Sequence, residues 1–415
     1  MPSATLANSH YGVVFACFMS EKKSVRNVAL LACAQAMANT QMVLIFTVSG
    51  LIGATIAPDA RMATVPITLQ FLAMMASTVP AAYTMRAIGR APGFIAFVGI
   101  GAVGVVIALW GVWEHDFWLF CLGSILFGFS QGSNQQLRFA AVDVASPEFK
   151  SRAVSLVLAG GVFAGLAGPT ISTLSVDLLG TVTFGGAFVA ILVTQVVMVA
   201  LLMFTDIPRP TAAERAATGR PFGEIARQPM FIVALLSAML GYGVMNFVML
   251  STPLIVVHSG HTIADSNDVI MWHVLGMFLP SFITGWLIKK YGDLNIIAVG
   301  ALLSLICLAV NLSGETLWHF RIAMALVGVG WNFMFTGGTT LLTETYTPAE
   351  KANVQGINDL LVFGTVAFCS LAAGTTYQWV GWTAVNIAVF PALAIVLGAN
   401  LWLRLQRRPA AVPAE

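Results

Sequence analysis

The chain carries very little charge. Asp, Glu, Lys and Arg make up 9% of its 415 residues, whereas a soluble domain usually carries about 25%. The chain also lacks a glycine-rich loop followed by Lys, which would bind nucleotide phosphates, and a Gly-x-Ser-x-Gly motif, which would present a nucleophilic Ser. These absences argue against a water-soluble protein, an ATP-driven pump and an enzyme.

Cysteine is scarce as well. The five cysteines stand at no paired spacing, and no Cys-x-x-Cys motif or histidine-rich tail is present: they are Cys17, Cys33, Cys121, Cys307 and Cys369. We therefore predict small buried side chains rather than a disulfide framework. Because the basic residues form no single patch, nothing indicates binding to nucleic acid.

Apolar side chains dominate the composition, at 58% of the residues. A helix needs about 20 apolar residues to cross a hydrocarbon core of roughly 30 Å. Twelve such stretches recur along the chain, and they predict an all-α membrane protein embedded in the lipid bilayer. We place the spans at 28–53, 64–84, 94–112, 118–141, 153–175, 183–204, 231–256, 269–288, 294–312, 320–342, 355–377 and 383–403.

The distribution of Lys and Arg predicts the orientation of these spans. With both termini in the cytoplasm, only Arg61 and Arg321 of the 20 basic residues fall outside the cytoplasmic segments. The apolar run at 12–19 precedes its lysines, the reverse of a cleaved export signal. If translation begins at Met19, residues 1–18 are an artefact of the assigned start codon. We expect a multi-pass protein of the bacterial inner membrane.

The two halves of the chain repeat one another. The loops at 85–90 and 288–293 set Gly89 against Gly292, an offset of 203 residues, and the loops at 143–150 and 344–351 match at an offset of 201. Internal repeats of this kind are typical of secondary transporters. The predicted organisation is a cytoplasmic segment at 1–27, six-helix bundles at 28–204 and 231–403, a linker at 205–230 and a cytoplasmic tail at 404–415.

These loops resemble the signature of the major facilitator superfamily, Gly-x-x-x-Asp-Arg-x-Gly-Arg-Arg. Gly89 and Arg90 are retained, while Ala82 stands for the first Gly and Arg86 for the Asp; the second copy keeps Gly285, Lys290 and Gly292. The resemblance implies the major facilitator fold, with twelve transmembrane helices in two six-helix pseudo-repeats. It also implies transport by alternating access, without a cofactor, and we expect a monomer.

Four soft side chains mark a candidate metal site. Met245 and Met249 lie four residues apart in one predicted span, and His273 and Met277 lie four apart in the next. This spacing puts each pair on one helix face, in a common layer of the outer half of the membrane. Thioethers and imidazole suit copper, above all Cu(I). The alternative is that the methionines only fill space in the core.

The order Met-x-x-x-Met followed by His-x-x-x-Met resembles the CcoA-like copper importers, a branch of this superfamily. The resemblance implies that Met245, Met249, His273 and Met277 bind copper as the transported substrate, and that import supplies cytochrome oxidase assembly. Related members are thought to move riboflavin. The alternative is therefore an organic solute such as riboflavin, whose site would use aromatic and amide groups, for example Asn39, Tyr242 and Asn332.

Other polar side chains are weaker candidates for residues of the entrance or the central cavity. His258 and His261, in an outer loop, are possible capture residues at the entrance, although loop histidines without a role are common. Asn39, Gln41 and Asn332 are candidates to line the central cavity, and hydrogen bonding between helices is their alternative use.

Asp359 is an acid within a predicted span, near the cytoplasmic face. It is a candidate to carry a coupling proton, and an ion pair with Lys351 or Arg138 is the alternative. A third kind of function, a membrane sensor on a transporter scaffold, would bind its ligand without moving it.

Overall fold

The computed structural model describes residues 4–59, 62, 65–175, 184–209, 211 and 219–407. Every regular element among them is a helix, as predicted. The helices are α1 (Ala4–Ile56), α2 (Val65–Ile88), α3 (Arg90–Trp113), α4 (Phe117–Asn134), α5 (Leu137–Val144), α6 (Lys150–Ser175), α7 (Gly185–Met203), α9 (Phe222–Ala226), α10 (Pro229–His258), α11 (Ile263–Phe278), α12 (Ser281–Tyr291), α13 (Asp293–Ser313), α14 (Leu317–Leu342), α15 (Lys351–Val380), α16 (Trp382–Ala388) and α17 (Phe390–Arg407).

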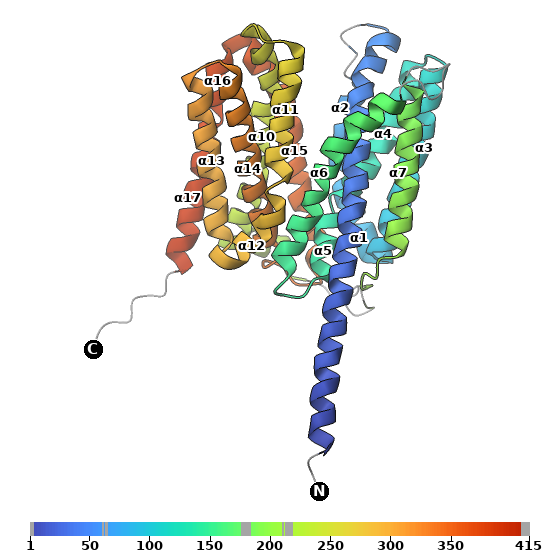
Figure 1. Cartoon of the computed structure of the whole chain (residues 1–415), viewed down its shortest axis with the longest axis vertical. Coiled ribbons are helices and arrows are strands. Elements are labelled where there is room, and N and C mark those ends of the chain that lie inside the picture. Colours follow the sequence, from blue (N-terminus) through green and yellow to red (C-terminus); the bar gives the residue numbers. More distant parts are fainter. Residues whose placement is uncertain are drawn as a thin grey trace, which may run out of the picture.

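Within the described residues, eleven stretches are long and apolar enough to cross a membrane. The remaining predicted span, at 118–141, corresponds to α4 and α5. The helices form two bundles, α1–α7 and α10–α17, which stand side by side (Figure 1). The start of α1 and the end of α17 lie at the same end of the molecule, which we call the termini end; the opposite end is the distal end. The bundles meet at the termini end and diverge toward the distal end.

Three predicted spans, at 118–141, 269–288 and 383–403, contain a break in their helix. Two of them still form single stretches that are long and apolar enough to cross a membrane, Asp265–Tyr291 and Trp382–Gln406. The breaks fall between α4 and α5, between α11 and α12, and between α16 and α17. At the second break Pro280 has no backbone N–H to continue the helix. In addition, α1 runs without interruption through the predicted boundary at residues 27 and 28.

The side chain of Asn332 stabilises the break between α11 and α12. Its amide nitrogen donates to the carbonyl of Met277, at 2.7 Å, and to Ser281 Oγ, at 2.5 Å. Its amide oxygen accepts a hydrogen bond from Thr284 Oγ1, at 2.6 Å. A membrane offers no water to satisfy the polar groups that a helix break frees, so a side chain must do so.

Small residues bring the two bundles into contact. Gly161 and Gly165 of α6 lie against Phe278 and Val274 of α11, and Gly285 of α12 lies against the backbone of Arg152 in α6. The Ser151 hydroxyl also donates to the Gly285 carbonyl, at 2.9 Å. On the other side of the interface, α2 packs against α15. Close packing through glycine is common between transmembrane helices, and here it joins the halves.

Candidate substrate site and the interface between the halves

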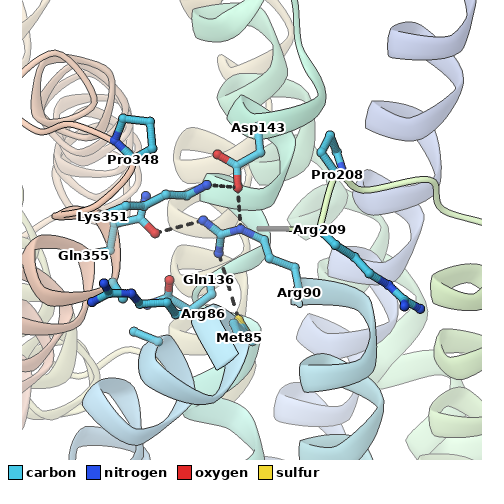
Figure 2. Close-up of a pocket in the computed structure, with 12 residues that line it drawn as sticks. Met85, Arg86, Arg90, Gln136, Asp143, Pro208, Arg209, Pro348, Lys351 and Gln355 are labelled. Carbon is cyan, nitrogen blue, oxygen red and sulfur yellow. Dashed lines mark hydrogen bonds and ion pairs between the residues drawn. The ribbon is translucent and has the colours of Figure 1, made fainter. Parts of the chain in front are cut away.

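A network of charged side chains joins the two halves at the termini end (Figure 2). Asp143 of α5 accepts from Arg90 Nε of α3, at 2.5 Å, and from Lys351 Nζ of α15, also at 2.5 Å. Arg90 donates in addition to Gln355 Oε1, at 2.9 Å. Because Lys351 and Gln355 belong to the C-terminal half, these contacts hold the termini end closed.

A second ion pair joins the halves at a deeper level. Arg138 of α5 pairs with Asp359 of α15, and their side chains are only 3% and 0% exposed. Asp359 also accepts from Gln136 Nε2, at 2.9 Å. The Arg138 guanidinium lies between the rings of Phe139 and Phe335, 4.7 and 4.6 Å from their centroids. Of the two partners proposed for Asp359, the structure pairs it with Arg138, while Lys351 contacts Asp143.

A third contact ties the linker to the C-terminal half. Glu350 accepts two hydrogen bonds from the Arg220 guanidinium, each at 2.7 Å. The Arg220 guanidinium holds the pKa of the Glu350 carboxyl well below its usual range. A carboxylate whose pKa is lowered in the folded state stabilises that state fully above the usual carboxyl pKa. It loses this stabilisation only as the pH falls through the lowered pKa. This contact therefore persists at neutral pH.

Aromatic rings of the C-terminal half gather beside the Arg138–Asp359 pair. Tyr242 of α10 lies edge-on to Trp331 and Phe335 of α14, with centroids 5.2 and 5.4 Å apart, and to Phe363 of α15, at 5.7 Å. Trp331 stacks on Phe335 at 5.2 Å and meets Phe278 edge-on at 5.8 Å. We call these five residues the aromatic wall. Tyr242 and Trp331 lie about halfway along their helices.

Buried amides of the N-terminal half form a second surface, the amide wall, consisting of Gln41, Gln70, Gln131 and Asn134. Asn134 donates to Gln131, at 2.8 Å, and Gln131 donates to Gln41, at 3.4 Å. Within the two walls, four hydrogen-bonding atoms lack a partner among the described residues: Gln41 Nε2, Gln70 Oε1, Asn134 Oδ1 and, in the aromatic wall, Trp331 Nε1. Burying such atoms unpaired is costly, so these atoms are candidates to bind a ligand.

The aromatic wall packs against methionines of the N-terminal half. Met74 of α2 packs with Phe363 of α15, and Met42 and Tyr242 pack against the same cluster. Gln70 of the amide wall donates to the Met42 sulfur, at 3.5 Å. The arrangement therefore offers flat apolar surface on one side and unpaired hydrogen-bonding groups on the other.

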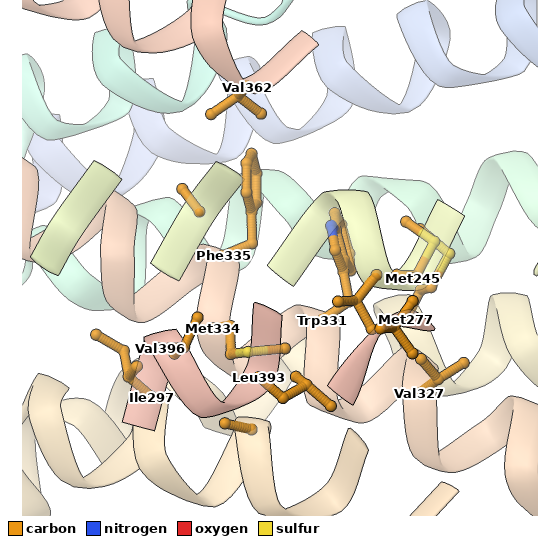
Figure 3. Close-up of a cluster of buried hydrophobic side chains, with 14 of the residues drawn as sticks. Met245, Met277, Ile297, Val327, Trp331, Met334, Phe335, Val362, Leu393 and Val396 are labelled. Carbon is orange, nitrogen blue, oxygen red and sulfur yellow. The ribbon is translucent and has the colours of Figure 1, made fainter. Parts of the chain in front are cut away.

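The three methionines among the predicted metal ligands belong to, or pack against, one hydrophobic cluster. Met245 and Met277 belong to one core of the C-terminal half, together with Trp331 (Figure 3). His273 is fully buried, and its Nδ1 lies 3.0 Å from the carbonyl of Met324 in α14. Its Nε2 has no partner among the described residues. Met249 is half-buried at the edge of the same core.

The remaining predicted site residues have varied surroundings. His261 Nε2 lies 3.0 Å from the Glu315 carbonyl, and His258 is exposed at the end of α10. Asn39 accepts a hydrogen bond from Gln35, at 2.9 Å, and Gln41 belongs to the amide wall. Asn332 uses its amide to hold the break between α11 and α12.

Comparison with known proteins identifies the family. The model of the Major Facilitator Superfamily matches residues 29–267 and 237–415. The chain belongs to the major facilitator superfamily. It is accordingly a multi-pass membrane transporter rather than an enzyme, and proteins of this superfamily typically need no cofactor.

Individual relatives extend the comparison. The chain is 37% identical over 391 residues to the riboflavin transporter RfnT of Brucella anthropi, covering 94% of this chain and 98% of the relative. The transporter FucP, in its outward conformation, matches 93% of this chain and 100% of its own, with a TM-score of 0.74 at 12% identity. The human organic anion transporter MFSD10 matches with a TM-score of 0.70, also at 12% identity, over 91% of this chain and 99% of its own.

Of the residues in the two walls, the sequence patterns indicated only Tyr242 and Gln41. Trp331, Phe335 and Phe363 are ordinary aromatic residues of apolar spans, and only their packing distinguishes them. A usable signal for the amide wall was present, because Gln70, Gln131 and Asn134 are amides inside spans that have few polar residues.

We predict that the Arg138–Asp359 pair behaves as a buried ion pair. Arg138→Met or Asp359→Leu alone leaves one charge buried without its partner and should lower the free energy of unfolding by about 3–5 kcal/mol. The double variant removes both charges and should recover most of this loss. Thermal unfolding of the purified protein in detergent measures both effects.

The matched control is the exposed pair of Lys23 and Asp206, whose side chains are 58% and 55% exposed. Exposed pairs contribute little, so Lys23→Met with Asp206→Leu should barely shift the unfolding temperature. A double variant of Arg138 and Asp359 that is less stable than either single variant would contradict the prediction.

Proposed function

We propose that the protein carries riboflavin across the bacterial inner membrane by alternating access. The observation that supports this best is the 37% identity to the riboflavin transporter RfnT over almost the whole of both chains. Copper, the substrate favoured by the methionine and histidine spacing, has no counterpart among these relatives. The organic solute considered as the alternative is therefore the better supported substrate.

The chemistry of the two walls suits a flavin. The isoalloxazine ring system is planar, with an apolar dimethylbenzene end and a pyrimidine edge that carries both donors and acceptors. The aromatic wall offers stacking and edge contacts to the ring faces. Gln41 Nε2 is an unpaired donor and Asn134 Oδ1 an unpaired acceptor, and together they match the mixed pyrimidine edge.

Charge at the site also agrees with a neutral solute. The charged groups closest to the walls, Arg138 and Asp359, neutralise each other. Riboflavin has no net charge at neutral pH, so its binding leaves no charge buried without compensation.

We place the termini end in the cytoplasm, as the distribution of Lys and Arg indicates. The closed termini end then corresponds to a state that takes up its substrate from the periplasmic side. For release into the cytoplasm, the contacts of Asp143, Asp359 and Ser151 across the interface must break. These contacts therefore set the barrier between the two states.

The first test is uptake of radiolabelled riboflavin into cells that express the protein. Tyr242→Leu removes an aromatic contact and Gln41→Leu removes a donor, and each should lower kcat/KM by about tenfold. Trp318→Leu, an exposed position in the same helix as Trp331, and Gln195→Leu, a buried amide in α7, are the matched controls. Absence of riboflavin uptake by the wild type would overturn the proposal.

We further propose that Asp359 binds the coupling proton. Opening the termini end separates Asp359 from Arg138, and two separated buried charges are strongly unfavourable. A proton on Asp359 removes one of them. The groups facing Asp359 are Arg138 from α5, Arg90 from α3 and Gln136 before α5, while Tyr346 lies in the preceding loop and Tyr242 faces Arg138 from α10. Among these Asp359 is the one carboxylate, so it is the natural proton acceptor.

In proteoliposomes, acidification of the outer solution should stimulate riboflavin accumulation by the wild type. Asp359→Asn cannot take up the proton, so it should lose this response while still exchanging riboflavin across the membrane at equal pH. Riboflavin exchange at equal pH is the control, because it shows that the variant folds and binds riboflavin. Accumulation by the variant that responds to pH as in the wild type would rule out this role.

Copper is the second candidate substrate, and one observation favours it. His273 Nε2 is buried without a partner, in the half of the molecule whose core contains Met245 and Met277. An imidazole nitrogen and thioether sulfurs are suitable ligands for Cu(I). In this proposal Met249, at the edge of the core, is the fourth ligand.

Radioactive copper uptake separates the two substrates. If copper is carried, His273→Ala and Met249→Ala should abolish its accumulation because each removes a ligand, and Tyr242→Leu should leave it unchanged. Met271→Ala, an exposed methionine of α11, is the control. Copper uptake that is equal in both ligand variants and the wild type would exclude copper binding by these residues.

A further inference from the structure

A groove of about 740 Å³ lies on the outer flank of the C-terminal half. Its sides come from α12, α13 and α17, and Phe333 of α14 contributes to its lining. Figure 1 shows α13 and α17 on the side of this half that faces away from the N-terminal half. The groove is therefore separate from the space between the halves, and the proposed transport function leaves it without a role.

Most of the groove is apolar. Ile296 and Phe333 are buried along its inner side, whereas Val299, Leu302 and Leu401 are 42%, 49% and 58% exposed. In a protein that spans a membrane, apolar side chains exposed on an outer flank face the hydrocarbon of the bilayer. The groove is therefore open to lipid along its length.

One end of the groove is polar, and this end lies at the termini end of the molecule. The Asn400 amide donates to the carbonyl of Leu294, at 2.8 Å, and so places the end of α17 beside the start of α13. Leu397 lines the groove seven positions before Arg404, so the apolar part extends roughly 10 Å from the polar end. This depth corresponds to the upper part of an acyl chain below its headgroup.

A cationic side chain is held in place at the polar end. Arg404 Nε donates to Asn400 Oδ1, at 2.7 Å, and Asn400 is only 2% exposed. This contact fixes one edge of the guanidinium. Among the described residues no carboxylate pairs with Arg404, so its remaining N–H groups are available to an anion at the mouth of the groove.

A second cation borders the same end. Lys290 Nζ lies 5.1 Å from the ring centroid of Tyr291, which lines the groove, and 4.9 Å from that of Trp286. The Asp293 carboxylate accepts from the backbone N–H of Leu294, at 2.9 Å, and forms no ion pair with any described residue. Aromatic and basic side chains of this kind are typical of the boundary between membrane and water.

We propose that this groove binds a phospholipid with an anionic headgroup. One acyl chain lies along the apolar part, and the phosphate binds the guanidinium of Arg404, with Lys290 beside it. A headgroup that carries an ammonium would add a third cation at this end, so an anionic headgroup is favoured. The inference stands apart from the proposed transport function, because none of these residues belongs to either wall.

A second copy of the chain fits the groove less well. In a two-fold symmetric contact the same patch lies on both subunits. Such a contact would bring Arg404 and Lys290 of one chain toward the same cations of the other. A lipid supplies the opposite charge together with the apolar chain, and a second copy does not.

Native mass spectrometry of the purified full-length protein in detergent tests the proposal. The protein is titrated with phosphatidylglycerol or with phosphatidylcholine that carries the same acyl chains. The wild type should bind one phosphatidylglycerol at least about tenfold more tightly than phosphatidylcholine, because only the first has a net negative headgroup.

Two variants alter the two parts of the site. Arg404→Gln with Lys290→Gln removes both cations, and Val299→Trp places a bulky ring in the apolar part; each should weaken phosphatidylglycerol binding by at least about tenfold. The matched control for the first is Arg26→Gln with Lys150→Gln, which removes two cations from the N-terminal half. The control for the second is Val103→Trp, at a position in α3 that is 55% exposed.

Both controls should bind phosphatidylglycerol as the wild type does, and all variants should unfold at the wild-type temperature in detergent without lipid, which shows that they fold. Equal affinity of the wild type for the two lipids overturns the proposal, and so does wild-type affinity in either groove variant. Dimers that Val299→Trp abolishes would also overturn it, because they would identify a second copy of the chain as the occupant.

Discussion

The buried ion pair between Arg138 and Asp359 is the interaction on which the closed state depends. Its two members come from different halves, and both side chains are buried. The pair is stable only while the halves are joined at this level, because either charge alone is strongly unfavourable in a membrane interior. Phe139 and Phe335 enclose the guanidinium, which links the pair directly to the aromatic wall.

This link connects the substrate site to the interface. Phe335 contacts both Tyr242 of the aromatic wall and the Arg138 guanidinium of the opposite half. A solute that binds between the walls therefore lies next to the ion pair that must separate during the cycle. Nearer the termini end, the Asp143 network adds a second layer of contacts between the halves. The glycines of α6 allow the close approach that both layers require.

Much of the fold was predictable from local patterns. Helices, their number and the repeat follow from apolar stretches and matching loops, which depend only on neighbouring residues. The breaks beside Pro280 and at Gln135 were not predicted, because the side chains that stabilise a break come from other helices, as Asn332 does. The metal site suggested by spacing stays a prediction. Spacing places Met245 and Met249 near one face of a helix, and packing brings His273 Nδ1 to the Met324 carbonyl while its Nε2 has no partner among the described residues.

The sequence by itself determined that this is a twelve-span transporter of two related halves, because hydrophobicity and basic residues report on the membrane directly. It also supplied the relationship to a riboflavin transporter. Only the tertiary structure decided that Asp359 pairs with Arg138 rather than with Lys351, and that aromatic rings of one half pack with methionines of the other. Arg138 and Asp359 are separated by 221 residues along the chain, and only helix packing determines which side chains meet.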